Sequence, residues 1–149
     1  MEKYYTSKGS SFYSRHLIGK LRHLTYKARQ RELTPYHISP QQAHILLLIH
    51  DLGGKTTLTE LANYVGRGVN TISEQMIKME NDGLVKKTRE IPKSTLLSFE
   101  LTEKGLDIYN RTNESRVIDE TIMSVLSHEE RKQFNLMLEK LISQTEKYQ

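Results

Sequence analysis

The most constraining feature of the sequence is a change of apolar spacing at Gly83. Two short segments before it carry apolar side chains at the spacing of helices, and Gly66 separates these segments. After Gly83 apolar and polar side chains alternate as they do in strands, which predicts strands over residues 84–90 and 96–101. Two short helices followed directly by a β-hairpin predict a winged helix-turn-helix over about residues 39–105.

Capping signals delimit the predicted helices. In a capping box, a serine or threonine is followed three residues later by glutamine or glutamate, and the two side chains bond reciprocally to the first backbone N–H groups of a helix. The sequence has three of these pairs, Ser39–Gln42, Thr57–Glu60 and Ser127–Glu130. The run 43–49 after the first pair is apolar nearly all round, so we expect a buried helix there.

Longer helical patterns flank the predicted winged helix-turn-helix. One runs over residues 12–32, one begins at the cap Thr102 and continues to about residue 126, and one follows Ser127. Their apolar stripes exceed what a small core can cover, so we expect residues 12–32 and 106–147 to be dimerisation helices. The predicted fold is mainly α with a small β-hairpin wing, in a single domain of residues 1–149.

Composition excludes several classes of function. The chain of 149 residues has no cysteine, which rules out disulfides and thiolate chemistry. It has no phosphate-cradling glycine loop, nucleophile elbow or metal-ligand spacing, so we expect no enzyme and no cofactor. No apolar run is long enough to span a membrane, and we expect a cytoplasmic protein. The net charge of +4 permits a polyanionic partner but does not demonstrate one.

Two motifs carry a resemblance to a known family. The stretch LTELANYVGRGVNTISEQMIKMENDGLV, residues 58–85, is similar without gaps to the helix-turn-helix of MarR-type regulators, and LTEKG, residues 101–105, matches the phrase that closes their wing. With the flanking helices the resemblance covers about residues 12–147. It implies a homodimeric transcriptional regulator, a repressor in our expectation, that binds a pseudo-palindromic operator in double-stranded DNA.

The predicted recognition helix begins near Gly68. If its apolar stripe faces the core, its first turn faces outward, where Asn70 suits bidentate pairing with adenine, and Thr71 and Ser73 suit bases or phosphates. Glu74 is less suited to phosphates, but it can accept from a cytosine amino group or pair with Lys78. The predicted DNA-binding residues of the helix-turn-helix are Arg67, Val69, Asn70, Thr71, Ser73, Glu74 and Lys78.

The predicted wing departs from the family. MarR-type wings usually carry an Asp-x-Arg phrase at the tip, whereas Lys93, Ser94 and Thr95 stand at the aligned positions here. The hairpin is nevertheless basic, and phosphate contact remains the expectation. The predicted DNA-binding residues of the wing are Lys86, Lys87, Arg89 and Lys93. A solvated hairpin face is the alternative interpretation of these side chains.

Other residues permit weaker hypotheses. The six histidines lack metal-ligand spacing, so we expect no metal site. The resemblance implies a small-molecule effector between the dimer helices and the winged domain, and Tyr26, Tyr36 and His44 are the candidates for binding an aromatic anion there. Packing at the seam between helices explains them equally well. The main alternative for the whole chain is a winged-helix adaptor that binds protein with weak or no specific DNA binding.

Overall fold

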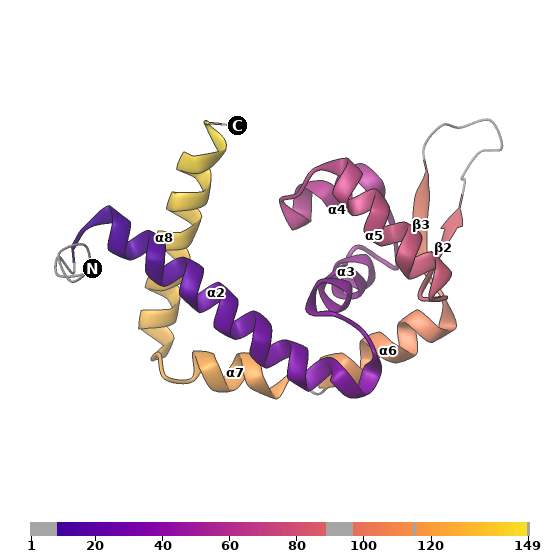
Figure 1. Ribbon diagram of the computed structural model, residues 1–149, viewed down its shortest axis with the longest axis horizontal. Helices are drawn as coiled ribbons and strands as arrows, with labels where there is room; N and C mark the ends of the chain where they lie inside the picture. The colour runs from indigo at the N-terminus through magenta and orange to yellow at the C-terminus, as the bar shows by residue number, and fades with distance from the viewer. Residues whose placement is uncertain (1–8, 89–96, 115, 149) are drawn as a thin grey trace. The chain divides into compact units, whose positions relative to one another are not determined.

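The computed structural model describes residues 9–88, 97–114 and 116–148, and the fold is mainly α with a small antiparallel sheet, as predicted (Figure 1). In chain order the elements are α2 (Ser11–Leu33), the 3-10 turn η1 (Thr34–Tyr36), α3 (Pro40–Asp51), β1 (Lys55–Thr57), α4 (Leu58–Val65), α5 (Val69–Asn81), β2 (Val85–Thr88), β3 (Ser98–Leu101), α6 (Glu103–Glu114), α7 (Val117–Met123) and α8 (His128–Glu146). The chain divides after residue 115 into two compact units, which are described separately below.

The predicted capping boxes are confirmed. At Ser39, Thr57 and Ser127 the hydroxyl accepts from the backbone N–H three residues on, and the side chain of that later residue bonds back to the cap. Each box satisfies two N–H groups that the first turn of a helix would otherwise leave unpaired. The starts of α3, α4 and α8 are therefore determined by local sequence.

The core of the first unit lies around α3. Ile45, Leu46 and Ile49 of α3 are fully buried, which confirms the expected burial of this helix. They pack in one cluster with apolar side chains of α4, α5 and the sheet. His50 of α3 stacks on Tyr109 of α6, a member of the same cluster, with ring centroids 4.1 Å apart.

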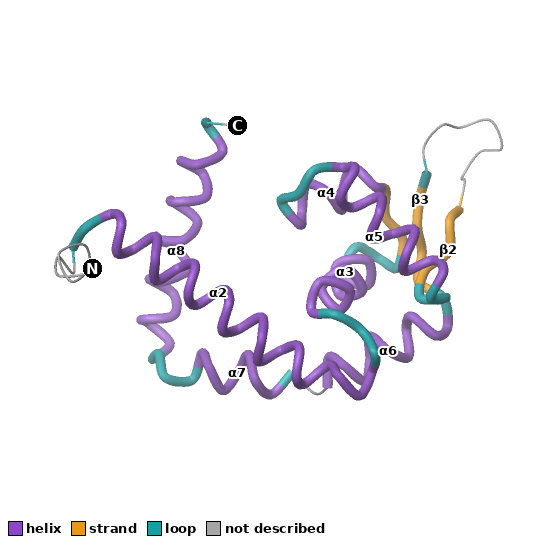
Figure 2. The backbone as a smooth tube through the Cα atoms, in the orientation of Figure 1, coloured by secondary structure: helices purple, strands orange, loops and turns teal. Residues whose placement is uncertain are grey.

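The sheet has three strands in the order β1-β3-β2, all antiparallel (Figure 2). The hairpin of β2 and β3 was predicted, but the short strand β1 was not, because three residues show no apolar period. β1 pairs Thr56 with Phe99. This extra strand covers one edge of β3, and Ser98 is buried although the predicted alternation placed it outside.

The predicted continuous helix from Thr102 to residue 126 is wrong, because the structure has two helices, α6 and α7. In a continuous helix the carbonyl of Thr112 would accept from the backbone N–H of Arg116. Here that carbonyl accepts instead from the Arg29 guanidinium of α2, at 2.9 Å, and Arg116 has a non-helical ψ of 40°. A contact from 83 residues away thus coincides with the break.

A tight junction joins α5, β2 and α6. The Thr102 hydroxyl donates to the carbonyl of Gly83 and accepts from the backbone N–H of Gly105 at 3.0 Å. Lys104 Nζ donates to the carbonyl of Asp82 at 2.7 Å. A Cβ added at Gly105 would lie 2.0 Å from the Leu84 carbonyl oxygen, so this position accepts only glycine without movement. The motif LTEKG therefore connects the end of the recognition helix to the start of α6.

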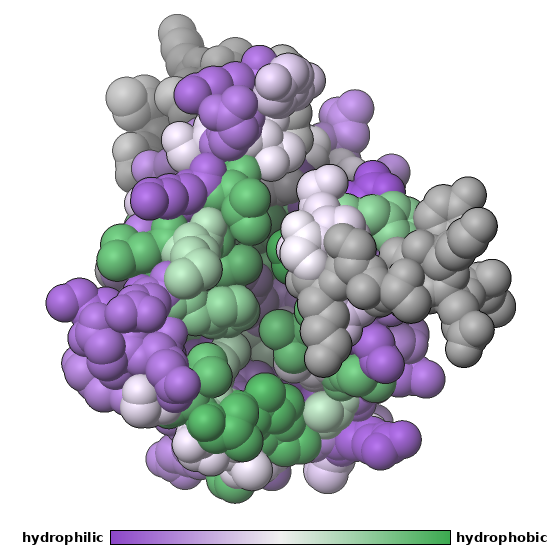
Figure 3. Space-filling view, turned by 90° about the vertical axis from the view of Figure 1, so that its left-hand side faces the viewer, coloured by the Kyte–Doolittle hydropathy of each residue, from purple (hydrophilic) through white to green (hydrophobic). Residues whose placement is uncertain are grey.

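The second unit consists of α7 and α8, and no described residue in it is fully buried. Large apolar side chains on both helices and in their connection are more than half exposed, namely Val117, Val125, Leu136, Met137, Leu141 and Ile142. Figure 3 shows hydrophobic residues, in green, on the exposed surface of the molecule. Among the described residues, no helix is long and apolar enough to cross a membrane.

Candidate nucleic-acid interface

The turn between α4 and α5 is built from glycine. Gly66 takes the left-handed conformation, with φ of 69°, and its N–H donates to the carbonyls of Ala62 and Asn63. The N–H of Arg67 also donates to the Ala62 carbonyl, at 3.1 Å. These bonds close α4 and redirect the chain, so α5 starts three residues after Gly66. The Arg67 side chain is left exposed in the turn.

The helix α5 presents one buried and one outward face. Ile72, Met76 and Met79 are fully buried, which confirms the predicted apolar stripe. The N-cap is Gly68, which has no side chain to bond the first N–H groups of the helix. These N–H groups therefore remain available to an anion such as a phosphate, and the positive end of the helix dipole favours it.

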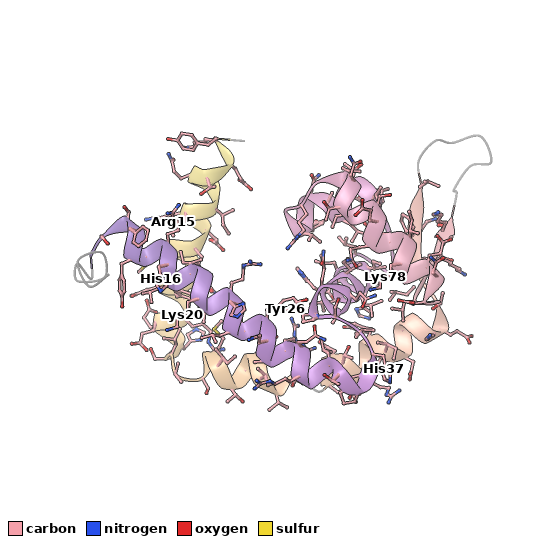
Figure 4. All side chains as sticks on the ribbon, in the orientation of Figure 1. Arg15, His16, Lys20, Tyr26, His37 and Lys78 are labelled. Carbon is pink, nitrogen blue, oxygen red and sulfur yellow. The ribbon has the colours of Figure 1, made fainter. Side chains whose placement is uncertain are left out.

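The predicted recognition residues lie on the other side of α5. Val69, Asn70, Thr71, Glu74 and Lys78 are exposed and Ser73 is partly buried. Lys78 is exposed on α5 and is labelled in Figure 4. Glu74 and Lys78 form no ion pair with each other in the described structure, so the carboxylate of Glu74 stays on the outward surface.

Two predicted wing lysines have acidic partners. Lys86 Nζ lies 2.8 Å from a carboxylate oxygen of Glu100, its cross-strand neighbour, and Lys87 Nζ lies 3.2 Å from Glu80 of α5. Both ammonium groups are exposed, so these ion pairs contribute at most about 1 kcal/mol each and can exchange for other anions. These acidic partners come from other elements, so no local pattern in the sequence predicted them.

The tip of the wing falls outside the described residues. Arg89, Lys93, Ser94 and Thr95 all belong to this part of the chain. Phosphate contact by Arg89 and Lys93 therefore stays a prediction. The helix-turn-helix also exposes two apolar side chains that the predicted site omitted, Tyr64 on α4 and Ile77 on α5, at 61% and 48%.

The three predicted effector residues do not all meet at one cavity. Tyr36 lines a cavity of about 370 Å³ with Asp82, Lys104 and Arg111, and the Arg111 guanidinium lies 5.2 Å from the centre of its ring. Tyr26 is exposed on α2 and His44 is exposed on α3, and neither lines this cavity. Figure 4 labels Tyr26 on α2 and His37, a further cavity residue, in the connection to α3.

Titratable groups of the site offer little for metal binding or acid–base chemistry. Within the described ranges, no three side chains of histidine, cysteine, aspartate or glutamate cluster as metal ligands would. Glu60 has a lowered pKa, because the Thr57 backbone N–H and the hydroxyls of Thr56 and Thr57 donate to its carboxylate. The Glu60 carboxylate thus caps the start of α4.

Comparisons with known proteins agree with this geometry. Residues 38–90 match the model of the MarR family. An organohalide-sensing transcriptional regulator, solved with 2,4-dichlorophenol bound, is 26% identical with a TM-score of 0.79, and the match covers 94% of this chain and 88% of that one. A search of curated protein sequences found no significant match.

Two further solved structures share the fold. MepR of S. aureus, solved with DNA, is 22% identical with a TM-score of 0.79, covering 94% of this chain and 99% of that one. AbsC, a MarR family transcriptional regulator from Streptomyces coelicolor, is 19% identical with a TM-score of 0.80, covering 97% and 100%. Residues 38–90, which include the helix-turn-helix, thus match the MarR family model, and the chain shares the fold of these solved transcriptional regulators.

Proposed function

We propose that the chain is a repressor that binds a pseudo-palindromic operator in double-stranded DNA as a homodimer. The observation that carries this proposal is the outward face of α5, where exposed polar side chains surround a helix start without a side-chain cap. A helix of this kind fits the major groove and its first turn reaches base edges. The solved MepR complex contains DNA, which supports the same role for this chain.

Individual side chains of α5 have distinct expected roles. Asn70 pairs with adenine through two hydrogen bonds, and Thr71 and Ser73 donate to bases or phosphates. Arg67 and Lys78 neutralise phosphates on either side of the groove. Glu74, exposed and without Lys78 as a partner, accepts from a cytosine amino group, which would make the operator sequence-specific at that position.

The wing contributes phosphate contacts. Lys86 and Lys87 are exposed, and each forms a solvent-exposed ion pair, with Glu100 and Glu80 respectively. Because such ion pairs contribute little free energy, a DNA phosphate can replace the carboxylate. Arg89 and Lys93 extend the same basic hairpin in sequence. These contacts position the protein on the duplex without selecting bases.

Exposed apolar surface supports the proposed homodimer. Leu17, Leu21 and Leu24 of α2 are 39–53% exposed, and the apolar side chains of α7 and α8 are exposed further. A monomer with such surface would present patches that soluble proteins cover. A second copy covers them when residues 12–32 and 106–147 of two chains pack about a two-fold axis. Two recognition helices then meet half-sites about one helical turn apart.

The test begins with selection of DNA from a random pool by the purified protein. Asn70→Ala should weaken binding to the selected site by about 1–3 kcal/mol and leave random DNA almost unaffected, whereas Lys93→Ala should weaken both alike. A monomeric mass at micromolar concentration would contradict the homodimer. Failure to enrich any sequence, with no fall of affinity at higher salt, would favour the protein-binding adaptor instead.

A small aromatic anion is the second part of the proposal. The cavity beside Tyr36 and the relative solved with 2,4-dichlorophenol favour an effector that shifts the dimer away from its DNA-binding state. By linkage, DNA must weaken the effector by the same factor as the effector weakens DNA. Titration of salicylate-like compounds with and without operator tests this reciprocity, and binding that leaves operator affinity unchanged would contradict it. Tyr26→Phe, Tyr36→Phe and His44→Ala would locate the residues involved.

A further inference from the structure

The outward face of α5 carries two exposed apolar side chains among its polar ones. Val69 is 44% exposed and Ile77 is 48% exposed. Exposed apolar side chains that occur singly are ordinary on protein surfaces. These two differ in their placement, because a separation of eight residues brings them within about a quarter turn of each other on the helix surface, with Ser73 between them. They form an apolar line beside Asn70.

We propose that Val69 and Ile77 recognise thymine through its 5-methyl group, at two positions of each operator half-site. This inference rests on the proposed function of α5 as the recognition helix. The thymine methyl is an apolar group that only the A·T pair displays in the major groove, and apolar side chains contact it. Asn70, exposed on the adjoining stripe, is matched to adenine, so polar and apolar side chains of α5 select the same kind of base pair.

Helix geometry sets the distance between the two thymines. Eight residues at a rise of 1.5 Å place Val69 and Ile77 roughly 12 Å apart along the axis of α5. Base pairs rise about 3.4 Å along the duplex axis, and the twist of the duplex lengthens the path along the groove to roughly 5 Å per base pair, so a helix lying along the groove meets methyl groups about two or three base pairs apart. The inference therefore predicts a pair of A·T positions with that separation, and not merely a preference for A·T.

Neither side chain contributes to the core of the first unit. The core cluster takes Ile72, Met76 and Met79 from α5 and includes neither Val69 nor Ile77. Truncation of either one to alanine therefore leaves the fold intact, and a loss of affinity reports on the DNA contact. The same exposure would suit a contact with another protein, and the experiment below separates the two.

The experiment uses the full chain and the site that it selects from random DNA. Each thymine is replaced in turn by uracil, which removes the methyl group and leaves the pairing edge unchanged. Replacement at two positions about two or three base pairs apart should weaken binding about three- to fivefold each, the value of one buried methyl group. In Ile77→Ala one of these two uracil effects should disappear, and in Val69→Ala the other.

Asn81→Ala is the matched control, because Asn81 is exposed at the end of the same helix, lies outside the proposed DNA-binding residues, and its change keeps both apolar side chains. Both uracil effects should persist in it. A selected site without uracil sensitivity, or with sensitivity that survives in both alanine variants, would overturn methyl recognition and leave DNA binding in place. If no site is selected at all, the proposed function fails together with this inference.

Discussion

Replacing Gly105 by alanine should destabilise the protein, although the same change inside a helix ordinarily stabilises by up to about 1 kcal/mol. The added Cβ would lie 2.0 Å from the Leu84 carbonyl oxygen, where real contacts are essentially never under 3.0 Å, so α6 and Leu84 must separate by 1.0 Å or more. Leu84 is held there, because its N–H donates to Met79 at 2.9 Å and its carbonyl accepts from Thr102.

The size of the effect follows from these two opposing contributions. Overpacking of this kind costs about 1–3 kcal/mol, and the upper end applies because the atom met is backbone. After the gain in helix propensity is subtracted, the expected net loss is about 2 kcal/mol. DNA binding should weaken as well, since Leu84 joins α5 to β2.

Urea denaturation at one fixed protein concentration measures this loss, because the stability of a dimer depends on concentration. The control is Gly9→Ala, where an added Cβ meets nothing within 4 Å and the residue lies outside the proposed dimerisation helices, so its stability should stay within about 0.5 kcal/mol of the parent. If Gly105→Ala were as stable as Gly9→Ala, the close approach of α6 to Leu84 would not constrain this position, and the reasoning would be wrong.

Three other perturbations test separate parts of the structure. The Glu60 carboxylate has a lowered pKa in the folded protein, so it stabilises the fold at pH values above its ordinary pKa of 4.5. This contribution is lost as the pH falls through the lower folded-state pKa. In Glu60→Gln the free energy of unfolding should therefore fall less steeply with decreasing pH on the acid side. Glu100→Gln removes the acidic partner of Lys86, so affinity for random DNA should rise about two- to fivefold at low salt in a fluorescence anisotropy titration. An unchanged affinity would mean that Lys86 does not reach a phosphate. Leu141→Asp should shift the mass in light scattering from dimer to monomer, and a dimer of unchanged affinity would place the interface elsewhere.

The local elements of the fold were predictable because their signals lie within a few residues. A capping box such as Thr57–Glu60 needs only one turn of chain, and Gly66 ends α4 because it adopts the left-handed conformation there. The apolar stripe of α5 likewise predicted which of its side chains are buried. From these the winged helix-turn-helix and the outward position of Asn70 followed.

The errors occurred where a distant part of the chain decides the local structure. β1 is three residues long and exists because β3 pairs with it, which no periodicity could reveal. The break between α6 and α7 falls where Arg29 takes the carbonyl of Thr112. The Lys86–Glu100 contact depends on the register of two strands, so a basic hairpin in the sequence is partly neutralised in the fold.

The sequence by itself determined the starts of α3, α4 and α8, the placement of the turn at Gly66 and the resemblance to the MarR family, because capping and apolar spacing act through neighbouring residues. Only the tertiary structure decided that Gly105 must be glycine and that Tyr36, but not Tyr26 or His44, lines the cavity. These properties arise from close approaches between elements that are separated along the chain, and such approaches depend on how whole helices pack.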